Sequence, residues 1–237
     1  MTPLISVAAA LNPSKDFDIE YVERLFAGVR KYTNDAALDF YLFSPEQPAL
    51  PGVRWVKTSV DLPGWWIKTE LWAMPGPLLY LDLDTEIVGS LAPLIRDVIM
   101  ARGPLMLRDL SPGSERLECG VMGWPASTRI MAQLYRRFQE AKGGFERGGN
   151  AGQLAMRDNA GKLWLNDEDW MRAELEERCC EVGRLQDQVA GIYSYSLDIG
   201  RRKDRALPED AMLVCFHGLP RPRDLRRSGD APAWMAP

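Results

Sequence analysis

One short segment, residues 78–88, limits the possible folds of this chain more than any other. It begins with the apolar run Leu-Leu-Tyr-Leu, continues into Asp82 and Asp84, and has proline and glycine on one side and glycine on the other. A short apolar run with such boundaries is typical of a buried strand in a parallel sheet. Side chains two residues apart on a strand point the same way, so both carboxylates would lie together where α/β sheets bind ligands.

Two neighbouring carboxylates repel each other and are costly to remove from water. They persist most easily where a divalent cation binds between them. The segment therefore predicts a metal site at Asp82 and Asp84. The alternative, an Asp-x-Asp sequence in an ordinary surface turn, stays open on this pattern alone.

The first sixty residues alternate between strand and helix patterns. Residues 4–11 form an apolar run, and residues 38–43 and 53–58 predict two further strands. Between the first two, Asp16 or Asp18 can cap a helix whose apolar residues fall on one face. Strand, helix and strand in this order predict a βαβ unit and an α/β fold.

Two segments resemble a known enzyme family. Tyr-Leu-Asp-Leu-Asp-Thr at residues 80–85 resembles the DxD segment of nucleotide-sugar glycosyltransferases with the GT-A fold, most of all the glycogenin-like and lipopolysaccharide galactosyltransferase-like group. His-Gly-Leu-Pro-Arg-Pro at residues 217–222 resembles the late His-x-Gly-x-x-Lys-Pro segment of that group. The resemblance implies a Rossmann-like, mixed and mostly parallel sheet flanked by helices. It also implies a single catalytic domain over residues 1–227, and we expect residues 228–237 to be a flexible tail.

The resemblance further implies a set of site residues. The metal, Mn²⁺ or Mg²⁺, would be held by Asp82, Asp84 and His217, which is the single histidine of the chain. The metal would in turn hold the diphosphate of a nucleotide-sugar donor. The residues implied in binding this donor are Asn12, Lys68, Asp82, Asp84, Gly218 and Arg221. Asn12 is included only because of its location, in the loop after the first strand.

Asn-Asp-Glu-Asp-Trp-Met at residues 166–171 resembles the family segment Gly-Asp-Gln-x-Trp-Ile, which lies beside the acceptor and the donor sugar. On this resemblance Asp167 and Glu168 are the catalytic candidates, with Glu168 in place of the glutamine. The pair Asp187 and Gln188 is a rival for the same position. Residues 118–124 resemble the segment that lines the sugar pocket, but Cys119 before Gly120 departs from its pattern.

Three local predictions concern the remaining chain. Residues 62–72 predict a short amphipathic helix that buries at least two of its three tryptophans. Residues 143–150 contain too many glycines for a helix or strand, so they predict a loop. Four arginines at positions 221, 223, 226 and 227 form a basic patch that would contact either the diphosphate or an anionic acceptor, or else belong to a solvated tail.

These observations predict a metal-dependent glycosyltransferase, a hexosyl- or pentosyltransferase that retains configuration if it follows the family. The alternatives are a metal-dependent nucleotidyltransferase or phosphatase, and a non-catalytic nucleotide-sugar-binding protein. The acceptor is open: a saccharide, a lipid-linked saccharide, a protein or a modified nucleobase. The net charge of −4 gives no general attraction to nucleic acid. The four cysteines lack zinc spacing, and neither a signal peptide nor a membrane span is evident, so we expect a cytoplasmic protein.

Overall fold

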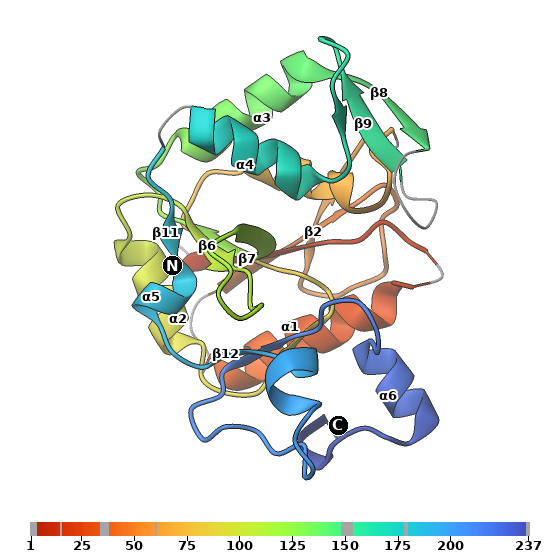
Figure 1. Ribbon diagram of the computed structural model, residues 1–237, viewed down its shortest axis with the longest axis vertical. Coiled ribbons are helices and arrows are strands. Elements are labelled where there is room, and N and C mark those ends of the chain that lie inside the picture. Colours follow the sequence, from red (N-terminus) through yellow and green to blue (C-terminus); the bar gives the residue numbers. More distant parts are fainter. Residues whose placement is uncertain are drawn as a thin grey trace.

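A mixed seven-stranded sheet lies between two layers of helices in the computed structural model (Figure 1). The structure describes residues 4–14, 16–33, 38–59, 61–147, 154–177 and 180–235. In spatial order the strands of the large sheet are β11 (Gly183–Arg184), β6 (Leu105–Arg108), β7 (Leu117–Trp124), β4 (Leu78–Leu81), β1 (Ile5–Ala10), β2 (Leu38–Ser44) and β3 (Arg54–Lys57). All neighbouring strands pair in parallel except β7, which is antiparallel to both β4 and β6. The predicted fold class is confirmed.

The predicted βαβ unit is present at the start of the sheet. Helix α1 (Ile19–Tyr32) connects β1 to β2, and its Asp18 cap accepts a hydrogen bond from the Glu20 N–H at 3.1 Å. Its buried face, with Phe26 fully covered, packs together with α2 (Ala92–Met100) beneath the sheet. This layer closes one side of the core.

The opposite face is covered by η1 (Gly64–Ala73), α3 (Ile130–Ala141) and α4 (Asp167–Glu177). The predicted helix at residues 62–72 is a 3₁₀ helix, η1, which buries Trp66 and Trp72 and leaves Trp65 36% exposed. Trp72 stacks on Trp170 of α4, with ring centroids 5.8 Å apart. This aromatic packing fixes η1 and α4 beside the end of β4, where both supply site residues.

Two smaller sheets complete the described structure. One contains β10 (Leu163–Trp164), β9 (Leu154–Asp158) and β8 (Lys142–Arg147), and the other contains β12 (Ile192–Ser194), β13 (Leu213–Cys215) and β5 (Thr85–Ile87). The short helices α5 (Leu185–Gln188) and η3 (Tyr195–Ile199) lie on either side of β12 in sequence. The second small sheet connects the late part of the chain to the segment that follows Asp84.

The glycine-rich segment is not a loop throughout, as the sequence predicted. Its first part is β8, which pairs with β9, while residues 148–150 lie outside the described residues. Gly143 sits at an irregularity in this pairing, where an added Cβ would come within 2.7 Å of the Arg157 carbonyl oxygen. Phe145 packs against Trp66 at 5.6 Å, so one aromatic contact and a ladder of backbone hydrogen bonds outweigh the low strand propensity of glycine.

The segment expected to be a flexible tail is packed as far as it is described. Helix α6 (Pro222–Ser228) is followed by η4 (Ala233–Met235), and Met235 is 2% exposed. Met235 packs with Tyr195 and Phe216 in a small apolar cluster. The residues that surround Met235 in the sequence did not indicate that it would be buried. Among the described residues, no helix is long and apolar enough to cross a membrane.

The contact between β7 and α2 offers a test of this packing. Gly123 faces Val98, and a Cβ at position 123 would lie 2.3 Å from a Val98 methyl group. Because valine has a stiff side chain, we expect Gly123→Ala to lower the free energy of unfolding by about 1–3 kcal/mol. The double variant Gly123→Ala, Val98→Ala should recover part of this loss in a urea titration. Additive losses would show that the two positions do not compete for the same space.

Candidate functional site

The two aspartates lie in a turn between β4 and β5, not on one strand as predicted. The Asp82 N–H donates to the Gly120 carbonyl of β7 at 2.8 Å, and the Thr85 N–H donates to the Asp82 carbonyl at 3.0 Å. These bonds end β4 at Leu81 and restart the chain as β5 at Thr85. The predicted outcome still holds, because both carboxylates line one cavity at the carboxyl end of β4.

This cavity has a volume of about 130 Å³ and is enclosed by five parts of the chain. They are η1, the turn after β4, β7, the first turn of α4 and the exit of β13. The lining residues are Lys68, Asp82, Asp84, Thr85, Glu118, Cys119, Gly120, Glu168, Cys215, Phe216 and His217. The structure therefore brings together Lys68, both aspartates, Glu168 and His217, five of the residues that the resemblance implied.

Lys68 is a buried cation at one wall of the cavity. Its Nζ lies 3.3 Å from Asp82 Oδ1 and 3.8 Å from Asp167 Oδ2. Burial favours the neutral amine, but the carboxylates of Asp167 and Asp82 outweigh this effect and raise the pKa of Lys68 well above its ordinary value. Lys68 is thus a fixed positive charge facing Asp82.

Each aspartate of the turn already has a partner. Asp82 accepts a short hydrogen bond from the Tyr80 hydroxyl in addition to the contact with Lys68. Asp84 Oδ2 accepts a hydrogen bond from Arg221 Nη1 at 2.9 Å. Burial, together with the charge of Asp82, raises the pKa of Asp84 to about 7 although Arg221 opposes the shift. The pair is therefore short of positive charge.

Glu118 is a site residue that the sequence analysis missed. Its Oε2 lies 3.8 Å from His217 Nδ1, and burial followed by repulsion from Glu168 raises its pKa to about 7. The alternation of β7 could have identified it. Glu118 and Gly120 are two residues apart on the strand, and Gly120 lies against Asp82.

The two predicted catalytic residues lie at different depths. Glu168 lines the cavity, and its Oε1 accepts a hydrogen bond from the Cys119 N–H at 2.9 Å. Asp167 is 2% exposed and lies behind Lys68, and burial raises its pKa to about 7. The rival residues Asp187 and Gln188 line a separate, larger cavity of about 820 Å³ beside β11, so they do not occupy the position of this pair.

The remaining predicted donor-binding residues lie outside the cavity lining. Asn12 Nδ2 donates to the Leu62 carbonyl at 3.1 Å, which ties the loop after β1 to the start of η1. Gly218 is exposed, with a φ of 76° that favours glycine, and it follows His217 directly. Arg221 contacts the site through Asp84.

The residues around the cavity fit a divalent cation in chemistry and charge. Carboxylate oxygens with one imidazole suit Mn²⁺ or Mg²⁺. Two cations, Lys68 and Arg221, face five carboxyl groups, which are those of Asp82, Asp84, Glu118, Asp167 and Glu168. Within the described ranges, however, no three His, Cys, Asp or Glu side chains are arranged closely enough to hold a metal ion. The three-ligand site therefore stays a prediction.

Comparison with solved structures finds glycosyltransferases. GlyE of Streptococcus pneumoniae TIGR4 is similar with a TM-score of 0.56 and 12% identity, over 98% of this chain and 62% of GlyE. The galactosyltransferase LgtC, in complex with donor and acceptor sugar analogues, gives 0.55 and 12% over 92% of this chain and 88% of LgtC. The bifunctional WbbM gives 0.59 and 11% over 99% of this chain and 51% of WbbM. An active-site glutamine-to-glutamate mutant of LgtC is also similar, with a TM-score of 0.52 and 11% identity.

The likeness establishes the fold of the chain as that of GT-A glycosyltransferases, which confirms the fold that the sequence resemblance implied. The chain spans less than two thirds of the length of GlyE and of WbbM. No protein-family model and no curated protein matches the sequence.

The shortage of positive charge should be measurable as a pH dependence of stability. The carboxyl groups of Asp84, Glu118 and Asp167 have ordinary pKa values near 4 and folded-state values of about 7. Between these values the folded protein binds protons that the unfolded chain has released, so its stability decreases as the pH rises from about 4 to 7. We expect the melting temperature of the metal-free protein to fall accordingly.

Glu118→Gln removes one of these groups and should flatten the fall. At pH 8 its melting temperature should exceed that of the wild type by about 2–4 °C, the shift that 1 kcal/mol produces in a protein of this size. Glu46→Gln changes an exposed carboxyl group away from the cavity and serves as the control. Parallel curves for the wild type and Glu118→Gln would contradict the raised pKa of Glu118.

Proposed function

We propose that this protein is a metal-dependent glycosyltransferase that moves a hexosyl or pentosyl group from a nucleotide-diphosphate sugar to an acceptor hydroxyl. The observation that carries the proposal is the buried Lys68 facing Asp82 and Asp84 at the carboxyl end of β4. Phosphate groups bind where fixed positive charge and a metal site meet. Lys68 supplies such a charge beside the proposed metal ligands, in a chain with the fold of GlyE, LgtC and WbbM.

In this proposal Asp82, Asp84 and His217 hold Mn²⁺ or Mg²⁺. When bound, the metal supplies positive charge to the diphosphate as the sugar–phosphate bond breaks. His217 is well placed for such a role because it follows β13, whose pairing with β5 carries it to the turn that contains Asp84. Burial lowers its pKa, so the neutral imidazole that a metal requires is favoured at neutral pH.

Lys68 supplies a second positive charge, and Asp167 positions it. A cation held by a buried carboxylate does not have to reorganise as negative charge grows on the leaving diphosphate, which is the condition for electrostatic stabilisation of a transition state. Asp167 is too deeply buried to reach a substrate, so we assign it to holding Lys68 and not to proton transfer.

Glu168 is then the carboxyl group proposed to face the reacting sugar. The transfer breaks the bond between the sugar and the diphosphate, forms a bond from the acceptor oxygen to the same carbon, and releases the acceptor proton. A carboxylate at the site can accept this proton or stabilise the positively charged sugar, and Glu168 stands where the family segment has glutamine. Retention of configuration is proposed from the sequence resemblance.

Turnover of nucleotide sugars with and without Mn²⁺ tests the proposal as a whole. A glycosyltransferase should slowly hydrolyse its donor in the absence of an acceptor, releasing the nucleoside diphosphate and the free sugar. Release of a nucleoside monophosphate or inorganic phosphate would instead indicate a nucleotidyltransferase or phosphatase. Binding without turnover of any donor would indicate a non-catalytic binding protein. The acceptor classes remain those named from the sequence: saccharide, lipid-linked saccharide, protein or modified nucleobase.

Asp84→Asn should abolish the metal-dependent part of donor binding. The substitution keeps the shape of the side chain but removes the charge that a divalent cation needs. We expect a loss of at least about tenfold in Mn²⁺ affinity measured by calorimetry in the presence of UDP or GDP, equivalent to about 1.4 kcal/mol. The circular dichroism spectrum should be unchanged. Wild-type Mn²⁺ affinity in this variant would remove Asp84 from the ligand set.

His217→Ala should lower Mn²⁺ affinity and donor hydrolysis together, with little change in the melting temperature of the metal-free protein. The His217 side chain is 35% exposed, so its removal leaves no buried cavity. As His217 is the single histidine of the chain, one imidazole resonance in NMR reports this residue alone. An imidazole that does not respond to Mg²⁺ with nucleoside diphosphate would contradict its role as a ligand.

A further inference from the structure

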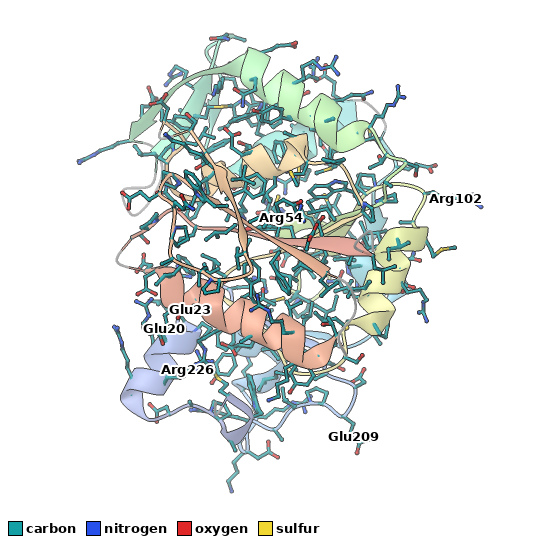
Figure 2. The ribbon with its side chains drawn as sticks, turned by 180° about the vertical axis from the view of Figure 1, so that it is seen from behind. Glu20, Glu23, Arg54, Arg102, Glu209 and Arg226 are labelled. Atoms are coloured by element: carbon teal, nitrogen blue, oxygen red, sulfur yellow. The ribbon has the colours of Figure 1, made fainter. Side chains whose placement is uncertain are left out.

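Three arginines attach the segment around α6 to the N-terminal half of the chain. Each forms an ion pair with an acidic residue of another element. The pairs are Arg221 Nη1 with Asp84 Oδ2 at 2.9 Å, Arg223 Nη2 with Asp18 Oδ1 at 2.7 Å and Arg226 Nη2 with Glu86 Oε1 at 2.6 Å. Figure 2 shows α6 lying beside α1, with Arg226 labelled where the two helices meet. The basic patch predicted from sequence is therefore largely an internal attachment.

Arg221 differs from the other two because its partner is a site carboxylate. Its side chain is 19% exposed and that of Asp84 is 14% exposed, so the pair is shielded from water. The guanidinium lies over the ring of Phe17, 4.3 Å from the ring centroid. The Arg221 N–H donates to Asp224 Oδ2 at 2.8 Å, which fixes the backbone at the start of α6. Arg221 is thus held in position from three sides.

The same carboxylate cannot serve the guanidinium and a metal ion without cost. Asp84 Oδ2 already accepts a charge-assisted hydrogen bond, and Asp82 is engaged by Lys68 and Tyr80. A cation that bound Asp84 through Oδ2 would have to take this oxygen from Arg221. A cation that bound through Oδ1 would still place two positive charges close together. Binding of the metal and pairing of Arg221 with Asp84 are therefore competing events.

We propose that Arg221 is the internal counter-ion of Asp84 in the metal-free protein, that a divalent cation displaces it, and that the displaced guanidinium then meets the anionic diphosphate. This inference rests on the proposed function. It implies that the metal alone binds weakly, because it has to break the Arg221–Asp84 pair. A nucleoside diphosphate should strengthen metal binding by offering the released guanidinium a new partner, in addition to bridging the metal directly.

Calorimetric titration of Mn²⁺ into the full chain, without nucleotide, tests the exchange. Arg221→Gln removes the competitor and should increase Mn²⁺ affinity about tenfold, the order expected for loss of one charge-assisted contact. Arg226→Gln is the matched control. It removes an ion pair of the same helix that does not involve the turn carboxylates, and it should leave Mn²⁺ affinity unchanged. Arg221→Lys keeps the charge on a more mobile side chain and should give an intermediate affinity.

A second measurement follows the same exchange by thermal shift. Arg221→Gln leaves Asp84 without its partner, so the metal-free variant should melt lower than the wild type, and saturating Mn²⁺ should stabilise it more than the wild type. The affinity of Arg221→Gln for UDP or GDP with Mn²⁺ should fall even though its affinity for Mn²⁺ alone rises. Opposite changes in these two affinities are specific to the proposed exchange, since a merely disturbed site would lose both.

Three results would overturn the proposal. One is Mn²⁺ affinity in Arg221→Gln that equals or falls below that of Arg226→Gln. Another is equal Mn²⁺ affinity in the presence and absence of Arg221 while nucleotide affinity falls. The third is donor hydrolysis that continues in EDTA with no Mn²⁺ binding by any variant, which would make Lys68 and Arg221 replacements for the metal. The third result would also remove the metal dependence of the proposed function. The first two would leave metal-dependent donor hydrolysis intact, so they show failure of this inference alone.

Discussion

The site depends on one buried interaction, the contact of the Lys68 ammonium with the carboxylates of Asp82 and Asp167. A lysine that is 9% exposed would lose its charge if it stood alone, because burial favours the neutral amine. The carboxylates of Asp82 and Asp167 keep the Lys68 amine charged. The ammonium in turn offsets the cost of removing the Asp82 carboxylate from water. The stacking of Trp72 of η1 on Trp170 of α4 holds together the two elements that carry Lys68 and Asp167.

Around this contact the site has more acidic than basic side chains, and the excess negative charge is reduced in two ways. Some carboxyl groups, among them Glu118, remain protonated at higher pH than usual, and Asp84 is paired with an arginine from a distant part of the chain. Both arrangements are reversible, because the proton can dissociate and the Arg221 guanidinium can separate from Asp84. Such a site favours a ligand that carries positive charge, and it disfavours an anion that binds without a cation.

The sequence predicted the fold well because apolar patterning and local capping determine it. The run that forms β4, the cap at Asp18 and the apolar face of α1 are all local signals, and the structure follows them. The family resemblance also pointed to Lys68, Glu168 and His217, and the structure brings all three to the cavity beside Asp82.

What the sequence did not predict depends on contacts between distant segments. Glu118 lies in the site because β7 runs antiparallel to β4, which brings the start of β7 beside the end of β4. A short apolar run does not indicate the direction of its strand. Strand pairing with β9 gives the glycine-rich β8 its structure, and burial of Met235 orders the segment expected to be loose. The partner of Asp84 is 137 residues away, so its identity required the folded chain.

The order of the elements along the chain has a consequence for biosynthesis. Every strand of the large sheet is made by residue 184, whereas His217 and Arg221 are made later. A ribosome that has released the sheet has therefore released Asp84 without its counter-ion. The nascent chain can assemble its hydrophobic layers early, since domains fold as their segments emerge. Until position 221 follows, the carboxyl group of Asp84 has to stay protonated or solvated, so the site matures only after the large sheet is complete.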